Sequence, residues 1–362
     1  MSSDHIHVPP FTISELIVPD SIDSPEAADF IGVAEVRRTV EAEQRGGTAE
    51  SATAAELLPN WKDETAPMSG LVGKVGSRVA ARGALALPLE ADECWAAVAV
   101  LPEFRGRGIG SALYERLERM ARAAGRRIIQ NQTSFVARVG GEDVPAPNGF
   151  GSVPRDLAST RFLQRFGFSL EQVGRLSVLQ LPMDAHSFSS RLASATHASV
   201  GYRTVTWQGR TPEGWLDDIA LLRTRSSTEE PNAGIQQTED VWTAERVRSV
   251  DDLQATSPRI LLTTVALHEA SGRLAGYTEL DVPPEADRPV EQAHTLVLRE
   301  HRGHRLGTLL KLVNLRELAA RFPGRRLVET MNAEENRHML DVNDALGFET
   351  DSYSARWKKN IR

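Results

Sequence analysis

The 362-residue sequence has a single cysteine, Cys94, and it lacks both a long hydrophobic run and a basic N-terminal region followed by an apolar signal core. One cysteine cannot form a disulfide within the chain, and no Cys/His cluster has zinc spacing, so we expect no metal site. The missing signal and membrane segments predict a cytoplasmic protein. The net charge of −7 disfavours nucleic acid and anionic membranes as partners.

The rest of the sequence is organised around residues 98–110, which read Val-Ala-Val-Leu-Pro-Glu-Phe-Arg-Gly-Arg-Gly-Ile-Gly. A β-prone run ends at Pro102, a glycine-rich turn follows, and residues 111–124 have the apolar spacing of a helix. Backbone N–H groups of such a turn, together with the start of the helix, form a cradle for phosphate or pyrophosphate. No Gly-Lys-Ser/Thr follows, and Ser111 stands where a Rossmann fingerprint needs glycine, so neither motif fits.

The remaining pattern, Arg-x-x-Gly-x-Gly at Arg105, Gly108 and Gly110, resembles the acetyl-CoA pyrophosphate loop of the GCN5-related N-acetyltransferase (GNAT) superfamily. The resemblance implies acetyl-CoA as cosubstrate, whereas the glycines alone imply only an anion. Six residues alone are equally compatible with an ordinary strand-to-helix turn that carries solvated arginines. The cosubstrate contacts expected here are Val98, Val100, Arg105, Gly106, Arg107, Gly108, Ile109, Gly110 and Ser111.

A second copy of this neighbourhood occurs at residues 295–307, Thr-Leu-Val-Leu-Arg-Glu-His-Arg-Gly-His-Arg-Leu-Gly. In both copies the following helix ends at a glycine before two arginines, at Gly125 and at Gly324. A chance turn would not repeat its surroundings, so we predict two GNAT-like domains in tandem. Arg305 replaces the first motif glycine, which makes close backbone approach less free. The contacts expected in this copy are Val297, Arg302, Gly303, His304, Arg305, Leu306, Gly307, Thr308, Asn332 and Asn336.

The resemblance implies an α/β fold in each half, with a mixed, largely antiparallel sheet and flanking helices, as in tandem GNAT proteins of actinobacterial type. We expect a disordered tail at 1–10, an N-terminal domain at 11–183, a linker at 184–200 and a C-terminal domain at 201–362.

The first domain has extra residues at 134–154, which are rich in glycine and proline and predict a long loop. We interpret this loop as a lid or as a contact with the other domain, and a tolerated surface insertion is an equally good reading.

Catalysis would need a carboxylate base with a raised pKa on a strand that lines the cleft. The position where several family members carry a glutamate is occupied by Cys94 in the first copy and by Glu291 in the second. Strict alternation predicts that Glu291 shares a face with Ala293, Thr295 and Val297, and that His294 points to the other face. A solvated charge at a strand start is the simpler interpretation of Glu291. Glu279, on the neighbouring strand, is the second candidate.

The family's acid tyrosine would fall at Leu163 and at Asn343, so tyrosine-type acid catalysis is in doubt in both domains. Asn343 is retained as a catalytic candidate because it can form hydrogen bonds. Asn332 and Asn336 stand where the family commonly holds the pantetheine arm, whereas Asp156 takes the position of Asn336 in the first domain.

We therefore predict an acetyl-CoA-dependent N-acetyltransferase that acts on a primary amine of a small molecule or peptide, with catalysis in the second domain. One alternative is a mycothiol-synthase-like acetyltransferase. The other is a non-catalytic acyl-CoA-binding or dimerisation module, and a homodimer is compatible with either reading.

Overall fold

The computed structural model describes residues 10–47, 51–138, 140–229 and 231–361. The tail predicted at 1–10 therefore lies outside the described residues except for Pro10. The chain divides into two compact units, each described here by itself. Unit 1 comprises Met1–Phe135, Leu157–Ser169 and Arg356–Arg362, and unit 2 comprises Val136–Asp156 and Leu170–Ala355.

This division differs from the expected domains 11–183 and 201–362 because the two halves of the chain exchange strands. Strand β8 (Ser169–Gln180), the last strand of the first half, pairs antiparallel with β13 (Leu327–Ala333) and is grouped almost entirely with unit 2. Strand β14 (Glu349–Asn360) ends the second half, but its residues from Arg356 onward belong to unit 1. The domain bounds predicted from the repeats assume that each half of the sequence forms its own sheet, so they cannot reveal such an exchange.

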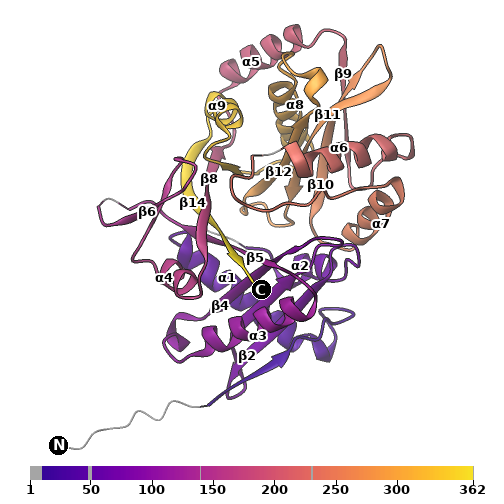
Figure 1. Cartoon of the computed structure of the whole chain (residues 1–362). Coiled ribbons are helices and arrows are strands. Elements are labelled where there is room, and N and C mark those ends of the chain that lie inside the picture. Colours follow the sequence, from indigo (N-terminus) through magenta and orange to yellow (C-terminus); the bar gives the residue numbers. More distant parts are fainter. Residues whose placement is uncertain (1–9, 48–50, 139, 230, 362) are drawn as a thin grey trace, which may run out of the picture. The chain divides into compact units, whose positions relative to one another are not determined.

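Unit 1 is built on a largely antiparallel sheet in the order β1-β2-β3-β4-β5, in which only β4 and β5 are parallel. Its strands are β1 (Phe11–Glu15), β2 (Met68–Val75), β3 (Arg78–Ala86), β4 (Glu93–Val100) and β5 (Ile128–Phe135). Its helices are η1 (Pro25–Ala27), α1 (Ala28–Gln44), α2 (Ala54–Trp61), η2 (Pro102–Phe104), α3 (Ile109–Ala123) and α4 (Ala158–Arg165) (Figure 1).

Helices α1 and α3 cover opposite faces of this sheet. An ideal Cβ on Gly83 of β3 would lie 3.2 Å from the side chain of Leu117 in α3. The preceding residue, Arg82, faces Arg37 and Glu41 of α1, and burial together with Arg37 lowers the pKa of Arg82 to about 10. Because successive strand residues point to opposite faces, the two helices sandwich the strands that lead into the glycine loop.

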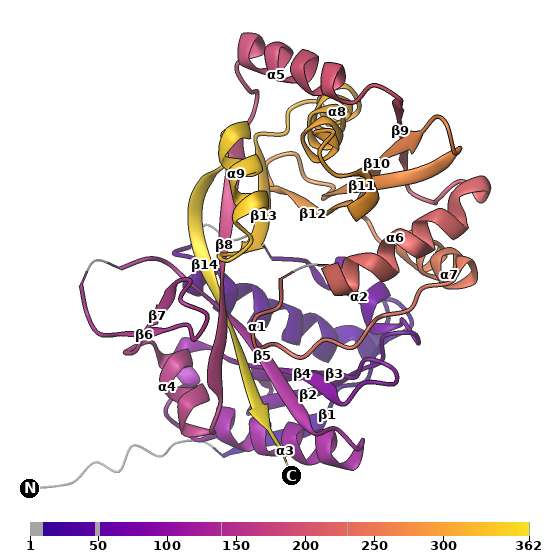
Figure 2. The ribbon, with the colours of Figure 1, turned by 45° about the horizontal axis from the view of Figure 1, so that its top comes forward.

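Unit 2 repeats the plan, with sheet order β14-β8-β13-β12-β11-β10-β9. Its further strands are β9 (Tyr202–Gln208), β10 (Ile260–His268), β11 (Arg273–Val282) and β12 (Val290–Val297). Its helices are α5 (Ala185–Ala198), η3 (Glu213–Trp215), α6 (Leu216–Glu229), α7 (Ala244–Gln254), η4 (Arg299–His301), α8 (Leu306–Arg321) and α9 (Arg337–Leu346). Figure 2 shows α6 and α8 on opposite sides of β10–β12, the arrangement that α1 and α3 have in unit 1. The predicted fold class is confirmed.

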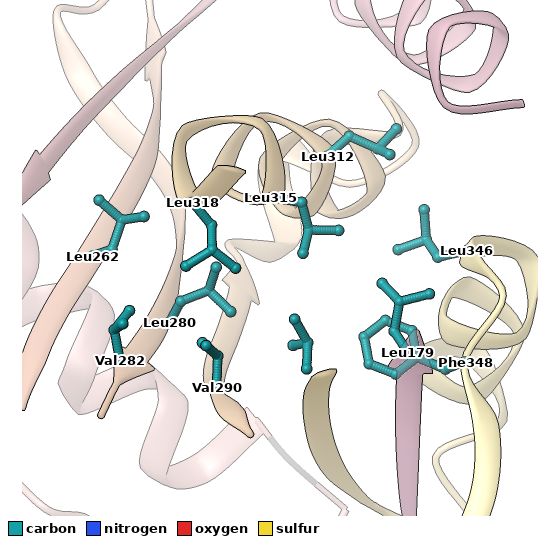
Figure 3. Close-up of a cluster of buried hydrophobic side chains, with 11 residues drawn as sticks. Leu179, Leu262, Leu280, Val282, Val290, Leu312, Leu315, Leu318, Leu346 and Phe348 are labelled. Atoms are coloured by element: carbon teal, nitrogen blue, oxygen red, sulfur yellow. The ribbon is translucent and has the colours of Figure 1, made fainter. Parts of the chain in front are cut away.

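The main core of unit 2 lies between α8 and the sheet. Leucines of α8 point toward aliphatic side chains of the strands, with Leu346 of α9 and Phe348 closing one end (Figure 3). The buried members are Leu179, Leu262, Leu280, Val282, Val290, Leu312, Leu315, Leu318, Val328, Leu346 and Phe348. Burial of these side chains contributes about 1.5–3 kcal/mol each and fixes α8 over the strands.

The segment predicted as a loop at 134–154 contains strand residues among its described positions, so this prediction is wrong in part. Its first two residues end β5, and β6 (Asp143–Pro145) and β7 (Ser152–Pro154) form an antiparallel hairpin. Pro147, Gly149 and Gly151 lie in the turn between these short strands. The role predicted for the segment, as a lid or a domain contact, stays a prediction.

Candidate functional site

The loop between β4 and α3 presents an open backbone. Gly106 and Gly108 have φ values of +75° and +83°, and no heavy atom lies within 4 Å of a Cβ built on either. Gly108 is the N-cap of α3. No backbone carbonyl of the described residues accepts a hydrogen bond from the N–H of Gly106 or Gly108, and the first N–H groups of a helix have no partner within it. The loop thus has the donors and the space for an anion.

The arginines of this loop are engaged with the protein. Arg105 donates from Nε to the carbonyl of Val100, at 3.0 Å, and from its two terminal nitrogens to the Glu43 carboxylate, at 2.8 and 2.5 Å. Arg107 donates to the carbonyl of Glu103, at 2.9 Å, and lies over the ring of Phe104. The backbone, and not the Arg105 guanidinium, is the open part of this loop.

The corresponding loop of unit 2 has the same backbone form despite its arginine. Arg305 is the N-cap of α8 with φ +53°, the left-handed conformation that Gly108 has in unit 1. Its guanidinium donates to Ser194 Oγ of α5, at 2.8 Å. Gly303 has φ +87° and open space around its Cβ position. Arg305 therefore adds a side chain at the edge of the loop, while the backbone keeps the left-handed conformation seen at Gly108.

Glu291 lies in a row of carboxylates that crosses three strands. It is paired with Asp281 of β11 on one side and with Glu329 of β13 on the other. Glu291 keeps contact with solvent, but the surrounding protein desolvates its carboxyl and the two neighbouring carboxylates repel its charge, so its pKa is raised. A carboxyl with a raised pKa suits the role of a general base.

A β-bulge overturns the predicted faces of β12. The pairing with β11 passes from Gln292 to His294 without a partner for Ala293, so Glu291 and His294 lie on one face and Thr295 on the other. Gln292 holds the bulge by donating from Nε2 to the carbonyls of Glu279, at 2.7 Å, and His294, at 3.1 Å. The prediction that His294 points away from Glu291 is therefore wrong.

The same bulge shifts the correspondence between the two copies by one residue. Trp95 of unit 1 pairs with Ala86 on β3, as Glu291 pairs with Asp281 on β11, and the next residues, Ala96 and Gln292, both pair with a leucine. The counterpart of Glu291 is therefore Trp95 and not Cys94. Cys94 is fully buried and its thiol pKa is raised to about 12 by burial, which leaves it without a role as base or nucleophile.

Glu279, the second candidate base, shares the Glu291 face but is enclosed. It is 4% exposed, and its carboxylate lies 3.4 Å from a terminal nitrogen of Arg223 on α6. The same nitrogen lies 3.8 Å from Asp251 of α7. A buried carboxylate that is engaged with Arg223 is less accessible to an incoming amine than the solvent-exposed Glu291.

Asn343 lies in the middle of a series of hydrogen-bonded polar side chains. Lys311 of α8, 2% exposed, donates from Nζ to Asn343 Oδ1, at 2.9 Å, and Asn343 Nδ2 donates to Asn332 Oδ1, at 2.7 Å. Asn336 instead caps α9 and accepts from the N–H of Met339, at 3.4 Å. Sequence reasoning missed Lys311, although a single lysine within the run Leu-Leu-Lys-Leu-Val was a visible signal. Leu163, which takes the position of Asn343 in unit 1, is buried and apolar.

Comparisons with known proteins agree with this architecture. Residues 69–170 match the acetyltransferase (GNAT) domain family. The structure is similar to that of a tandem GNAT protein from the clavulanic acid biosynthesis pathway, with a TM-score of 0.73 and 26% identity over 97% of this chain and 98% of that one. Residues 69–170 thus belong to the GNAT domain family, and the chain as a whole has the tandem GNAT architecture. The GNAT domain and these neighbours indicate an acyltransferase, and the GNAT fold is one that binds acetyl-CoA or CoA.

Two more distant structures share the fold with this tandem GNAT protein. The GCN5-related N-acetyltransferase from Sphaerobacter thermophilus has a TM-score of 0.62 and 16% identity, over 97% of this chain and 96% of that one. A putative acetyltransferase from Pyrococcus horikoshii has a TM-score of 0.53 and 11% identity, over 100% and 93%. No curated protein matches the sequence. Within the described residues, no helix is both long and apolar enough to span a membrane.

Proposed function

We propose that this GNAT protein transfers the acetyl group of acetyl-CoA to a primary amine of a small molecule or peptide in the cytoplasm. The observation that carries the proposal is the open backbone cradle at the start of α3, repeated at the start of α8 despite Arg305. In each cradle the outward N–H groups and the positive end of the helix would hold the pyrophosphate. Val98, Val100 and Val297 lie on the strands that lead into the loops, where the pantetheine arm would run.

We place the chemistry in unit 2 because that unit has a suitable base. Glu291 would accept a proton from the attacking amine as its nitrogen bonds to the thioester carbon. The carbon–sulfur bond then breaks, and the CoA thiolate leaves. Asn332 of β13 would supply an amide group for the pantetheine arm, and the buried Asn343 of α9 would hold it in place through its hydrogen bond. Unit 1, with Leu163 and with Trp95 in place of Glu291, would hold acetyl-CoA without reacting.

Substitution of Glu291 tests this assignment. Release of CoA with a panel of amines should fall by roughly 10² to 10⁴ in Glu291→Gln, while acetyl-CoA affinity measured by calorimetry stays at the wild-type value. Asp281→Asn is the matched variant, because removing a neighbouring negative charge lowers the pKa of Glu291. Its rate profile should therefore keep full activity to a lower pH than that of the wild type.

Full activity of Glu291→Gln at every pH would remove Glu291 from the mechanism. Binding of acetyl-CoA without turnover of any amine would favour the second candidate function, a non-catalytic acyl-CoA-binding module. The buried, apolar Leu163 at the position that Asn343 has in unit 2 is the observation that favours this alternative for unit 1.

A further inference from the structure

We propose that Arg105 and Arg302, the motif arginines, act as positioning residues that tie each glycine loop to a helix of its own unit, α1 in unit 1 and α6 in unit 2, and that neither is a phosphate ligand. This inference rests on the proposed function, because it concerns how the loops hold acetyl-CoA. It reverses the role that the family resemblance suggests for both side chains.

In unit 1, one side chain joins three elements. The Nε of Arg105 donates to the carbonyl of Val100, the last residue of β4, at 3.0 Å. The terminal nitrogens form a two-pronged pair with Glu43, in the last turn of α1, at 2.8 and 2.5 Å. The fork geometry uses both carboxylate oxygens, which is the strongest arrangement of an arginine with a carboxylate. These contacts use three of the five N–H donors of the guanidinium, so a phosphate could take over the two-pronged arrangement only by displacing Glu43.

Unit 2 has the same connection. Arg302 donates from Nε to the carbonyl of Val297, the last residue of β12, at 3.2 Å, and from a terminal nitrogen to Glu229, the last residue of α6, at 2.5 Å. The two loops differ at the second and third positions after this arginine, where Arg107 and Gly108 of unit 1 correspond to His304 and Arg305 of unit 2. A contact that is kept while its neighbours change points to a role common to both loops.

The connection has a physical consequence for the cradle. The N–H groups that would hold pyrophosphate can converge only if the loop keeps its left-handed turns at Gly106 and Gly108. A side chain that fixes the loop to the strand end and to α1 before acetyl-CoA arrives lowers the cost of ordering those N–H groups on binding. The negative charge of Glu43 would by itself weaken the binding of an anion to the neighbouring loop. Its presence there is therefore consistent with a role in fixing Arg105.

The test compares acetyl-CoA affinities, measured by calorimetry, in a full-length Gly303→Asp background that isolates the unit 1 loop. Glu43→Gln and Arg105→Gln should each weaken binding by about fivefold, which corresponds to ~1 kcal/mol, the upper end for a half-exposed pair. The double variant should be no weaker than Arg105→Gln alone. Glu229→Gln in a Gly106→Asp background should repeat the result in unit 2.

A phosphate-ligand role predicts the opposite pattern. Glu43→Gln would then leave the affinity unchanged or raise it, because a competing carboxylate is gone, while Arg105→Gln alone would weaken it; that pattern overturns the inference. Unfolding temperatures of the variants separate loop ordering from loss of fold, since a purely structural effect would lower the unfolding temperature without changing the affinity. Absence of acetyl-CoA binding by the wild type would instead overturn the proposed function itself.

Discussion

Lys311 is the single residue whose environment is most at odds with its chemistry. The ammonium group is buried in unit 2, with one hydrogen bond to Asn343 and the ring of Phe348 at 5.7 Å. Burial lowers the pKa of Lys311 to about 7, because a charge is costly in a medium of low dielectric. The lysine therefore loses its proton in the folded chain near neutral pH, whereas in the unfolded chain it keeps it to about pH 10.4.

This difference predicts how stability depends on pH. Between pH 7 and pH 10 the unfolded state binds one more proton at Lys311 than the native state, so this group makes the free energy of unfolding rise with pH, by about 1.4 kcal/mol per unit at most. Lys311→Met should remove that contribution and stabilise the protein most at pH 7 and below. Urea unfolding across this range, with the exposed Lys62→Met as control, measures it. Parallel profiles for wild type and Lys311→Met would contradict the assignment.

At the scale of elements, β12 shows where sequence reasoning succeeds and where it stops. The strand and the loop after it were predictable, because an apolar run and spaced glycines are local signals. The bulge at residues 292–294 was not, since it depends on pairing with β11 and on the Gln292 side chain. Because Ala293 has no partner on β11, His294 and Thr295 lie on the faces opposite to those predicted. For the same reason the counterpart of Glu291 in unit 1 is Trp95 and not Cys94.

The β6–β7 hairpin gives a second prediction at this scale. Gly149 and Gly151 both have φ +80°, but a Cβ on Gly151 would lie 2.9 Å from Val173, whereas nothing lies within 4 Å of one on Gly149. Gly149→Ala should cost only the left-handed conformation, about 1–2 kcal/mol. Gly151→Ala should cost a further 1–3 kcal/mol or so for overpacking. Equal urea midpoints of the two variants would show that Val173 yields freely to the added methyl group.

At the scale of the whole molecule, the tandem plan was predictable because the glycine loop recurs with its neighbourhood, and two full copies leave little room for chance. The exchange of β8 and the end of β14 between the units was not predictable, because each strand reads as the natural close of its own repeat. The partners of Arg105 and Arg302 were hidden for a related reason. Glu43 and Glu229 lie far from the motifs in sequence, and only the fold brings them to the loops.

The claim on which the rest depends is that both glycine loops are acetyl-CoA cradles, and a matched pair of substitutions tests it. Gly106 and Gly303 have φ values of +75° and +87° and equally open surroundings, so Asp at either position adds the same strain and places a carboxylate in one cradle only. The loss of a charge-assisted hydrogen bond between the loop and the pyrophosphate corresponds to roughly 1.5–3 kcal/mol, or about 10- to 100-fold in affinity. Calorimetric titration of the full-length protein with acetyl-CoA should show two binding events, with one weakened in Gly106→Asp and the other in Gly303→Asp; isotherms of both variants that match the wild type would contradict the claim.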